Sequence, residues 1–354
     1  MFLCSQWGGP RRIQVTFKFF IYTFIGSLLM LVGLLYIYFH TKDQSFDITA
    51  FYTASLSDNR TGPGFSGYLF IAFCYQDAIF LFIPGSLIPM SNRQQLPRWL
   101  LSGVMVKMGV FGLLRWLLPV VPLASYSWGD VVSSMSVAGM IYASLIAIKQ
   151  DDLKRLVAYS SIAHIGLMCV AIFAENKSGM QGVMIQMFNH GVNIIGLWIV
   201  VELIERQFGT RKISELGGLA QKAPAMAILF VVIALANIAL PLTNAFVGEF
   251  LMFNGVFSSV VTKYNVWFTV LAGLSIVFAA VYTLNMIRKV FYGEPNSLTA
   301  ATQDISFNEK LALGVIVILI FWMGVYPQSL LSVTNEITDT ILNKSDIIRL
   351  IKKQ

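Results

Sequence analysis

The stretch LSGVMVKMGVFGLLRWLLPVV, residues 101–121, decides how the rest of this chain is interpreted. It is an apolar run long enough to cross the ~30 Å hydrocarbon core of a bilayer as one helix, and it contains a lysine, Lys107. A lysine at the centre of a membrane helix costs roughly 2.5–3.5 kcal/mol or more to insert. The stretch therefore predicts a helix whose Lys107 faces protein or water inside a bundle. The alternative is a structural lysine whose ammonium reaches the membrane surface.

The composition of the whole chain extends this pattern. Of its 354 residues, 56% are hydrophobic and 12% are charged, and the mean hydropathy is +0.70, whereas soluble domains carry about 25% charged residues. We therefore predict an all-α polytopic transmembrane bundle. Nine apolar runs are candidate spans: residues 17–39, 67–88, 99–121, 130–148, 156–174, 181–203, 224–257, 265–287 and 311–330.

The run 224–257 is too long to be one straight span, because as a helix it would measure about 51 Å at 1.5 Å per residue. Pro241 lies near its centre and removes a backbone donor, so we predict a broken helix. Glu249 follows within the same run, flanked by apolar residues. A carboxylate beside a discontinuous helix is typical of ion pathways in membranes. The alternative is a capping or packing glutamate near an interface.

Two histidines lie in the middle of apolar runs. His164 follows Ser160 and Ser161, and His190 lies between amides in the sequence MFNHGVN. A neutral imidazole can pass on a proton near physiological pH and is less costly to bury than a permanent charge. Both are candidate proton carriers, although His164 is equally compatible with a buried hydrogen-bonding role.

Other classes of function find no support in the sequence. The three cysteines and three histidines show no ligand spacing, so we expect no metal site and no disulfide framework. The net charge of +7 comes from basic residues in short loops, which argues against a nucleic-acid partner. If successive loops alternate sides, fifteen basic residues gather on one side and four on the other. The positive-inside rule then places the N-terminus in the cytoplasm and the C-terminus outside.

The organisation is that of one transmembrane domain, residues 1–354. The N-terminus lacks the pattern of a secretory signal, and residues 41–65 are expected to form an external loop. Residues 335–354 form a charged tail with apolar residues at helical spacing. We expect this tail either to lie along the membrane surface or to be solvated.

Several motifs together carry a resemblance to a known family. They are WGGPRR, KFFIYTFIGSLLML, SGVMVKMGVFGLLR, QDDLKRLVAYSSIAHIG, MFNHGVN and FVGEF. These resemble the antiporter-like subunits M, called chain 4 in mitochondria, of the proton-pumping NADH:quinone oxidoreductase, complex I. Subunits of multisubunit sodium/proton antiporters are similar to the same family and give the second interpretation. A purely structural membrane subunit or an inactive fragment is the third.

The resemblance implies a proton relay coupled to electron transfer elsewhere in the complex. By this resemblance Lys107 is the central relay lysine, His190 its neighbour and Glu249 the terminal site, with His164 and then Lys154 as less certain members. It also implies that NAD, flavin, iron–sulfur clusters and quinone are bound by other subunits and that no cofactor is bound by this chain. The expected partners are the other membrane-arm subunits, especially the flanking antiporter-like ones, and the lipid bilayer. The expected location is a bacterial inner membrane.

Departures from the family pattern concern three places. The early helices of the family are missing, so we expect the chain to be truncated at its N-terminus. Leu242 follows Pro241 where the family usually has glycine. Residues 73–99 fit the family badly, and the family's second intramembrane lysine and Phe-His-Thr-Trp-x-Pro-Asp motif are absent there. Codons can be chosen for residues 82–99 that, read one base earlier, encode FHTWQPDTYEQSPTATAV, which contains that motif. We therefore expect a local frameshift.

Resequencing of the gene tests this frameshift. We expect the codons for residues 73–99 to encode the missing family motif when they are read one base away from the present frame. An open frame whose codons do not encode the motif in another register would contradict the hypothesis.

Overall fold

The computed structural model describes residues 12–41, 44–53, 103–104, 106–300 and 303–344. Regular structure in these ranges is helical apart from one isolated bridge between Asp152 and Lys212, so the expected all-α class is confirmed. The elements are α2 (Arg12–His40), α3 (Ile48–Thr53), α7 (Val106–Gly112), η2 (Leu113–Leu117), α8 (Leu118–Val120), α9 (Pro122–Ile148), α10 (Leu153–Phe173), α11 (Lys177–Phe208), η3 (Ile213–Glu215), α12 (Leu219–Lys222), α13 (Pro224–Asn237), α14 (Asn244–Phe257), α15 (Asn265–Val290), α16 (Phe307–Val325) and α17 (Gln328–Lys344).

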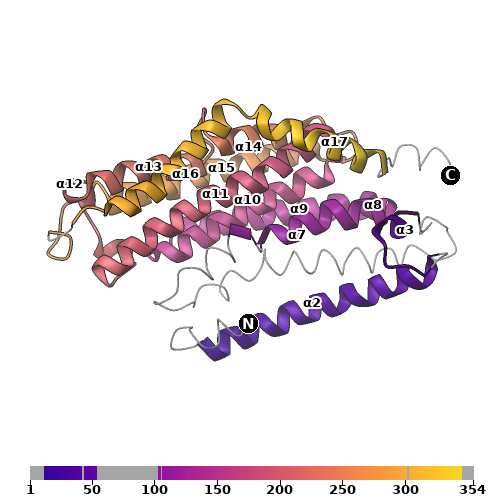
Figure 1. Ribbon diagram of the computed structural model, residues 1–354, viewed down its shortest axis with the longest axis horizontal. Helices are drawn as coiled ribbons and strands as arrows, with labels where there is room; N and C mark the ends of the chain where they lie inside the picture. Colours follow the sequence, from indigo (N-terminus) through magenta and orange to yellow (C-terminus); the bar gives the residue numbers. More distant parts are fainter. Residues whose placement is uncertain (1–11, 42–43, 54–102, 105, 301–302, 345–354) are drawn as a thin grey trace.

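Helices α10 and α11 form the centre of the bundle (Figure 1). Helix α10 is buried along nearly its whole length, and it packs against α9 and α11. Its first turn is capped by Asp152, whose carboxylate accepts the backbone N–H groups of Lys154 and Arg155. Helix α11 packs most extensively on α14. This contact needs Gly182, because a Cβ there would lie 2.7 Å from the backbone nitrogen of Met252.

Five described helices are long and apolar enough to cross a membrane: α9 from Ala124, α10, α11, α15 and α16. Their positions agree with five of the predicted spans. The predicted span 67–88 lies outside the described residues, as does the residue range 73–99 of the frameshift hypothesis. The expected number of nine spans therefore stays a prediction.

The helix that carries Lys107 contains a π-helical segment, η2, between α7 and α8. Pro119 in α8 has no N–H to give to the carbonyl of Arg115 four residues earlier. That carbonyl accepts the hydroxyl of Tyr52 instead, at 2.8 Å. The proline thus accounts for the local change in helix geometry.

The predicted break in the run 224–257 is confirmed. Helix α13 ends at Asn237, and α14 begins at Asn244. Two residues between them have positive φ angles, Ala239 at 57° and Leu242 at 74°. The left-handed region favours glycine, so Leu242 occupies a conformation that suits the glycine usual in the resembling family.

A second break lies beside the first and was not predicted from the sequence. The run 311–330 was expected to be one span, but α16 ends at Val325 and α17 begins at Gln328, on either side of Pro327. The end of α16 touches the first break, because Gly324 lies against the carbonyl of Leu242. Helix α17 then follows α11, where Asp339 pairs with Lys177 at 2.8 Å. Residues 335–344 of the expected tail are therefore helical and packed on protein, and residues 345–354 are outside the described ranges.

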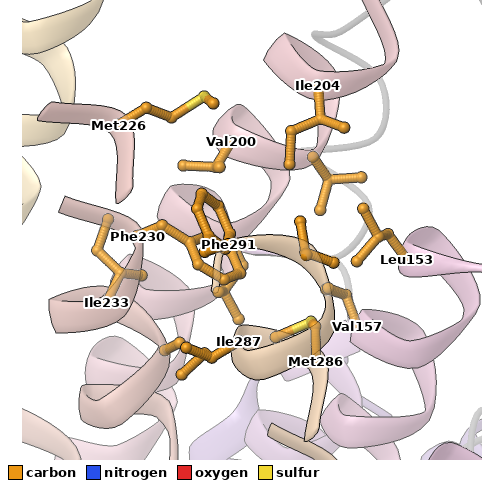
Figure 2. Close-up of a cluster of buried hydrophobic side chains, with 14 of the residues drawn as sticks. Leu153, Val157, Val200, Ile204, Met226, Phe230, Ile233, Met286, Ile287 and Phe291 are labelled. Carbon is orange, nitrogen blue, oxygen red and sulfur yellow. The ribbon is translucent and has the colours of Figure 1, made fainter. Parts of the chain in front are cut away.

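The two ends of the bundle differ in their cores. We call the end where α10 begins the Lys154 end and the end where α11 begins the Lys177 end. Figure 2 shows the apolar cluster of the Lys154 end, in which side chains from α10, α11, α13 and α15 meet around Phe230 and Phe291. The rings of these two phenylalanines stack with centroids 4.7 Å apart. A second apolar cluster fills the Lys177 end.

The left-handed Leu242 leads to a prediction about stability. We expect Leu242→Gly to stabilise the purified protein by about 1 kcal/mol, because the left-handed conformation costs a non-glycine residue roughly 1–2 kcal/mol and this side chain is 67% exposed. Thermal unfolding in detergent measures the effect. The matched control is Leu240→Gly, at an exposed neighbour without a positive φ angle, which is expected to lower stability. Equal loss in both variants would contradict the prediction.

Candidate functional site

Four titratable side chains from four helices gather in the interior of the bundle. They are Lys107 on α7, His190 on α11, His164 on α10 and Glu249 on α14, and each is 7% exposed or less. Charged groups are rarely buried unless they are paired. We call these four residues the central row, and the contacts between them give its order.

The contacts place His164 between His190 and Glu249. The Nδ1 atom of His164 lies 3.0 Å from Oε1 of Glu249. The rings of His164 and His190 are 4.8 Å apart between centroids and are tilted by 43°. The charge of Lys107 acts on the His190 imidazole. The order is therefore Lys107, His190, His164, Glu249.

Helix α11 adds a stripe of amides to the central row. Gln186, Asn189, His190 and Asn193 recur at helical spacing and are all buried. Both polar atoms of the Gln186 and Asn193 amides lack a hydrogen-bond partner among the described residues, as does Nε2 of each central histidine. Buried polar atoms of this kind are commonly satisfied by ordered water. The arrangement therefore has the donors and acceptors needed to hold a chain of water beside the central row.

The amide stripe is tied to the broken helix. Nδ2 of Asn189 donates to the carbonyl of Asn244 at 2.7 Å, and Nδ2 of Asn244 donates to the carbonyl of Asn189 at 3.3 Å. Asn244 is the first residue of α14, and Asn189 directly precedes His190. The break and the central row are thus held together by two hydrogen bonds.

The amide stripe stops at Asn193. Towards the Lys154 end the same face of α11 carries Leu197, Val200 and Ile204, which are buried. The apolar cluster of Figure 2 surrounds these residues. From Asn193 to Glu202 this apolar section is about 14 Å long at 1.5 Å per residue.

Lys154 lies beyond this apolar section, in a separate ion-pair cluster. Its buried ammonium contacts Glu205 and lies 3.7 Å from Glu202. Arg211 joins the same cluster through Asp152, at 2.6 Å, and Glu205, at 3.7 Å. The structure thus brings four of the five predicted site residues together and places Lys154 elsewhere, where it joins α10 to the end of α11.

Two further residues belong beside the central row but were not singled out from the sequence. Gln186 lies against Gly248, the neighbour of Glu249, and its helical spacing from Asn189 and His190 was a usable signal. Tyr282 on α15 is buried and interacts electrostatically with Glu249. A tyrosine in an apolar run carries no signal that separates this position from a packing role.

The chemistry available to the central row is acid–base chemistry. Amine, imidazole and carboxyl groups can each accept and release a proton. Within the described ranges no group of three or more histidine, cysteine, aspartate or glutamate side chains is arranged to hold a metal ion.

The chain is similar to a known protein family and to named members of that family. The family described as NADH:quinone oxidoreductase/Mrp antiporter, TM, matches residues 1–279. NADH-quinone oxidoreductase subunit M of Rickettsia conorii is 36% identical over 351 residues, which cover 97% of this chain and 68% of that protein. NADH-ubiquinone oxidoreductase chain 4 of Chondrus crispus is 33% identical, with coverage of 98% and 69%. The chain thus spans about two thirds of the length of these relatives.

Solved structures share the fold. Respiratory complex I from Thermus thermophilus contains a chain that superposes with a TM-score of 0.86 at 24% identity, covering 96% of this chain and 70% of that one. The Mrp complex from Dietzia sp. contains a chain that superposes with a TM-score of 0.79 at 15% identity, covering 96% of this chain and 70% of that one.

The position of Lys154 leads to a prediction about assembly. We expect Lys154→Met to lower the stability of the folded subunit by about 3–5 kcal/mol, because it leaves Glu205 and Glu202 without their buried cation. The amount of folded subunit in membranes measures this. Glu205→Gln should lower the folding stability less in the Lys154→Met background than in the wild-type protein. In that background Glu205 has already lost its pairing with Lys154. Normal levels of the single variant would contradict a structural role.

Proposed function

The chain belongs to the NADH:quinone oxidoreductase/Mrp antiporter transmembrane family, and on that premise we propose that its central row carries protons as part of a NADH:quinone oxidoreductase. The observation that supports this most is the succession of buried titratable groups from Lys107 to Glu249, in which His190, His164 and Glu249 lie side by side. Isolated ionisable residues at membrane depth are costly. A succession of four on four different helices is accounted for by proton transfer.

The contacts suggest how a proton passes through the His164 end of the row. A proton that arrives at Nε2 of His164 makes the ring an imidazolium. The ring then releases the proton on Nδ1 to Oε1 of Glu249, 3.0 Å away, and returns to the neutral state. Each transfer breaks one N–H or O–H bond and forms another, and it leaves His164 as the opposite tautomer, so the ring must turn over or exchange its proton before it can pass on the next one.

At one end of the row, Lys107 is positively charged only while its amine holds a proton, and we call this its loading. A protonated Lys107 disfavours a second positive charge on His190, and a neutral one removes that penalty. The loading of Lys107 therefore biases the direction in which a proton moves along the row. The amides of α11 supply acceptors and donors for the water that bridges the longer gaps.

The broken helix is the element that we propose to respond to the charge of the row. Breaks in membrane helices allow local movement without loss of the whole helix. Asn189 and Asn244 connect this break to His190. A shift of α14 would therefore change the distance from Glu249 to His164.

The apolar cluster of the Lys154 end restricts where protons enter. We propose that it blocks passage along the α10–α11 axis, because protons do not cross a dry apolar region without polar groups or water. The excess of basic residues in the loops at this end supports a cytoplasmic location for it. Protons would then enter beside α7.

The proposals for the partners and the location of this chain are based on its relatives and on solved structures of the same fold. Multisubunit membrane complexes contain chains of this fold, and we propose that flanking antiporter-like subunits are the immediate partners of this one. NAD, flavin, iron–sulfur clusters and quinone would be bound by other subunits. The bacterial inner membrane is the proposed location, in line with the Rickettsia relatives.

A subunit of a multisubunit sodium/proton antiporter is the second candidate, since the Mrp complex shares the fold. The named relatives at 33–36% identity are all oxidoreductase subunits. Sodium-dependent growth that requires this gene would favour the antiporter.

The relay leads to a prediction about Lys107. We expect Lys107→Ala in the assembled complex to reduce proton pumping at least tenfold, because the row loses the amine at one of its ends, whereas NADH oxidation with an artificial acceptor continues. Pumping is followed in inverted membrane vesicles with a pH-sensitive dye.

The matched control is Arg115→Ala, which removes an exposed cation from the same predicted span. It is expected to pump normally. Unchanged pumping in Lys107→Ala, with the complex intact, would rule out the relay and leave a structural subunit.

A further inference from the structure

Two buried asparagines, Asn193 on α11 and Asn237 on α13, carry polar atoms that no described residue satisfies. They are 0% and 3% exposed. Both polar atoms of the Asn193 amide and Oδ1 of Asn237 lack a hydrogen-bond partner within the described ranges. A buried polar atom without a partner is destabilising, so packing alone would be served better by leucine. Asn237 is the last residue of α13, directly before the break.

Two contacts show that Asn193 faces the broken helix. On one side of it along α11, Asn189 exchanges two hydrogen bonds with Asn244, at 2.7 and 3.3 Å. On the other side Gly196 lies against Ile233 of α13, where an added Cβ would be 3.0 Å from the isoleucine side chain. Asn189, Asn193 and Gly196 are spaced i, i+4 and i+7, so they share one face of α11. Asn193 therefore lies between these two contacts, on the face that meets both halves of the broken helix.

The register of α11 and α13 brings Asn237 to the same level. The two helices are antiparallel neighbours, since α11 ends at the Lys154 end and α13 runs from there to the break. Asn193 lies three residues from Gly196 towards the break, which is about 4.5 Å along α11. Asn237 lies four residues from Ile233 in the same direction, about 6 Å along α13, and this i, i+4 spacing keeps it on the face that meets α11. The two amides thus lie opposite each other beside the break.

The chemistry of these groups suits a water molecule. Nδ2 of Asn193 is a donor, and Oδ1 of Asn193 and of Asn237 are acceptors. A buried water typically makes about three hydrogen bonds to groups of this kind, and the two amides supply them. A metal cation is disfavoured here, because Nδ2 of Asn193 would point a donor at it and because Lys107 and His190 of the same row can each become positive.

We propose that Asn193 and Asn237 are positioning residues that hold a water molecule between α11 and the end of α13, and that this water joins the break to the central row. The inference rests on the proposed proton relay. The water accepts a hydrogen bond from Nδ2 of Asn193 and donates one to Oδ1 of Asn237, which leaves one hydrogen and one lone pair for further bonds. One turn away on α11, Nε2 of His190 is also buried and without a partner among the described side chains. The held water thus extends the hydration of the row to the break.

The two halves of the broken helix are then attached to α11 in different ways. Helix α14 is bonded directly, through Asn189 and Asn244, whereas α13 is bonded through the water held by Asn193 and Asn237. A direct hydrogen bond of 2.7 Å breaks when the distance grows, but a bridging water can follow a shift of either partner. The end of α13 can therefore move relative to α14 while the row stays hydrated.

The test is Asn237→Leu in the assembled complex, with proton pumping measured in H2O and in D2O. We expect pumping to fall about tenfold and the ratio of the two rates to rise, because proton transfer becomes limiting when the bridging water is lost. NADH oxidation with an artificial acceptor should be unchanged. Asn237→Ser keeps an oxygen acceptor and room for the water, so it should pump at close to the wild-type rate. Asn308→Leu, the same substitution at an exposed position of α16, should leave rate and ratio unchanged.

A second variant, Asn193→Leu, removes the opposite half of the site and should give the same two changes. Because both amides hold one water, the double variant should pump no more slowly than either single variant. A wild-type rate and ratio in either assembled single variant would overturn the inference. A slower rate with an unchanged ratio would also overturn it, since that result indicates a packing defect.

A high-resolution cryo-EM map of the wild-type complex tests the site even if neither variant assembles, and it does so independently of the relay. We expect a water peak within hydrogen-bond distance of both Asn193 and Asn237. Direct contact between the two amides, or resolved side chains without a peak, would overturn the inference. If Lys107→Ala abolishes pumping and the map shows no such water, the relay stands and the inference fails. If Lys107→Ala pumps normally, the relay fails whatever the map shows.

Discussion

The contact between His164 and Glu249 is the interaction on which the rest of this structure depends. A carboxylate at membrane depth is costly unless a neighbour compensates for it, and His164 lies 3.0 Å away. Helices α10, α11 and α14 must therefore pack closely enough to bring the two side chains together. Gly182 on α11 allows this approach, since a Cβ at that position would meet the backbone of α14.

The apolar cluster of the Lys154 end bears on the path that protons can take through the bundle. The cluster around Phe230 and Phe291 is apolar and buried, and this is the basis for the proposed barrier at the Lys154 end. Lys154 itself serves to fix the end of this barrier, because Glu202 and Glu205 come from the last part of α11. We propose that this separation of an apolar end from a centre lined with polar groups confines proton transfer to the row.

The neighbouring breaks place irregular backbone at one level of the bundle. Irregular backbone within a membrane is tolerated only beside protein or water. The first break lies beside Asn189 on one side and beside the end of α16 on the other, where Gly324 meets the carbonyl of Leu242. The second break, at Pro327, therefore puts the end of one helix against the exposed backbone of another. A movement of α14 would therefore displace α16 as well as His190.

The sequence by itself determined the class of the protein, the first helix break and most of the candidate site. Apolar runs of sufficient length and a proline inside an overlong run are local features, and a buried Lys107 or Glu249 is visible as a charge among apolar residues. The order of the central row was decided only by the tertiary structure, because helical spacing gives the face of a residue and not the helix that this face meets. The same reason explains Lys154, whose partners Glu202 and Glu205 lie about fifty residues away in sequence.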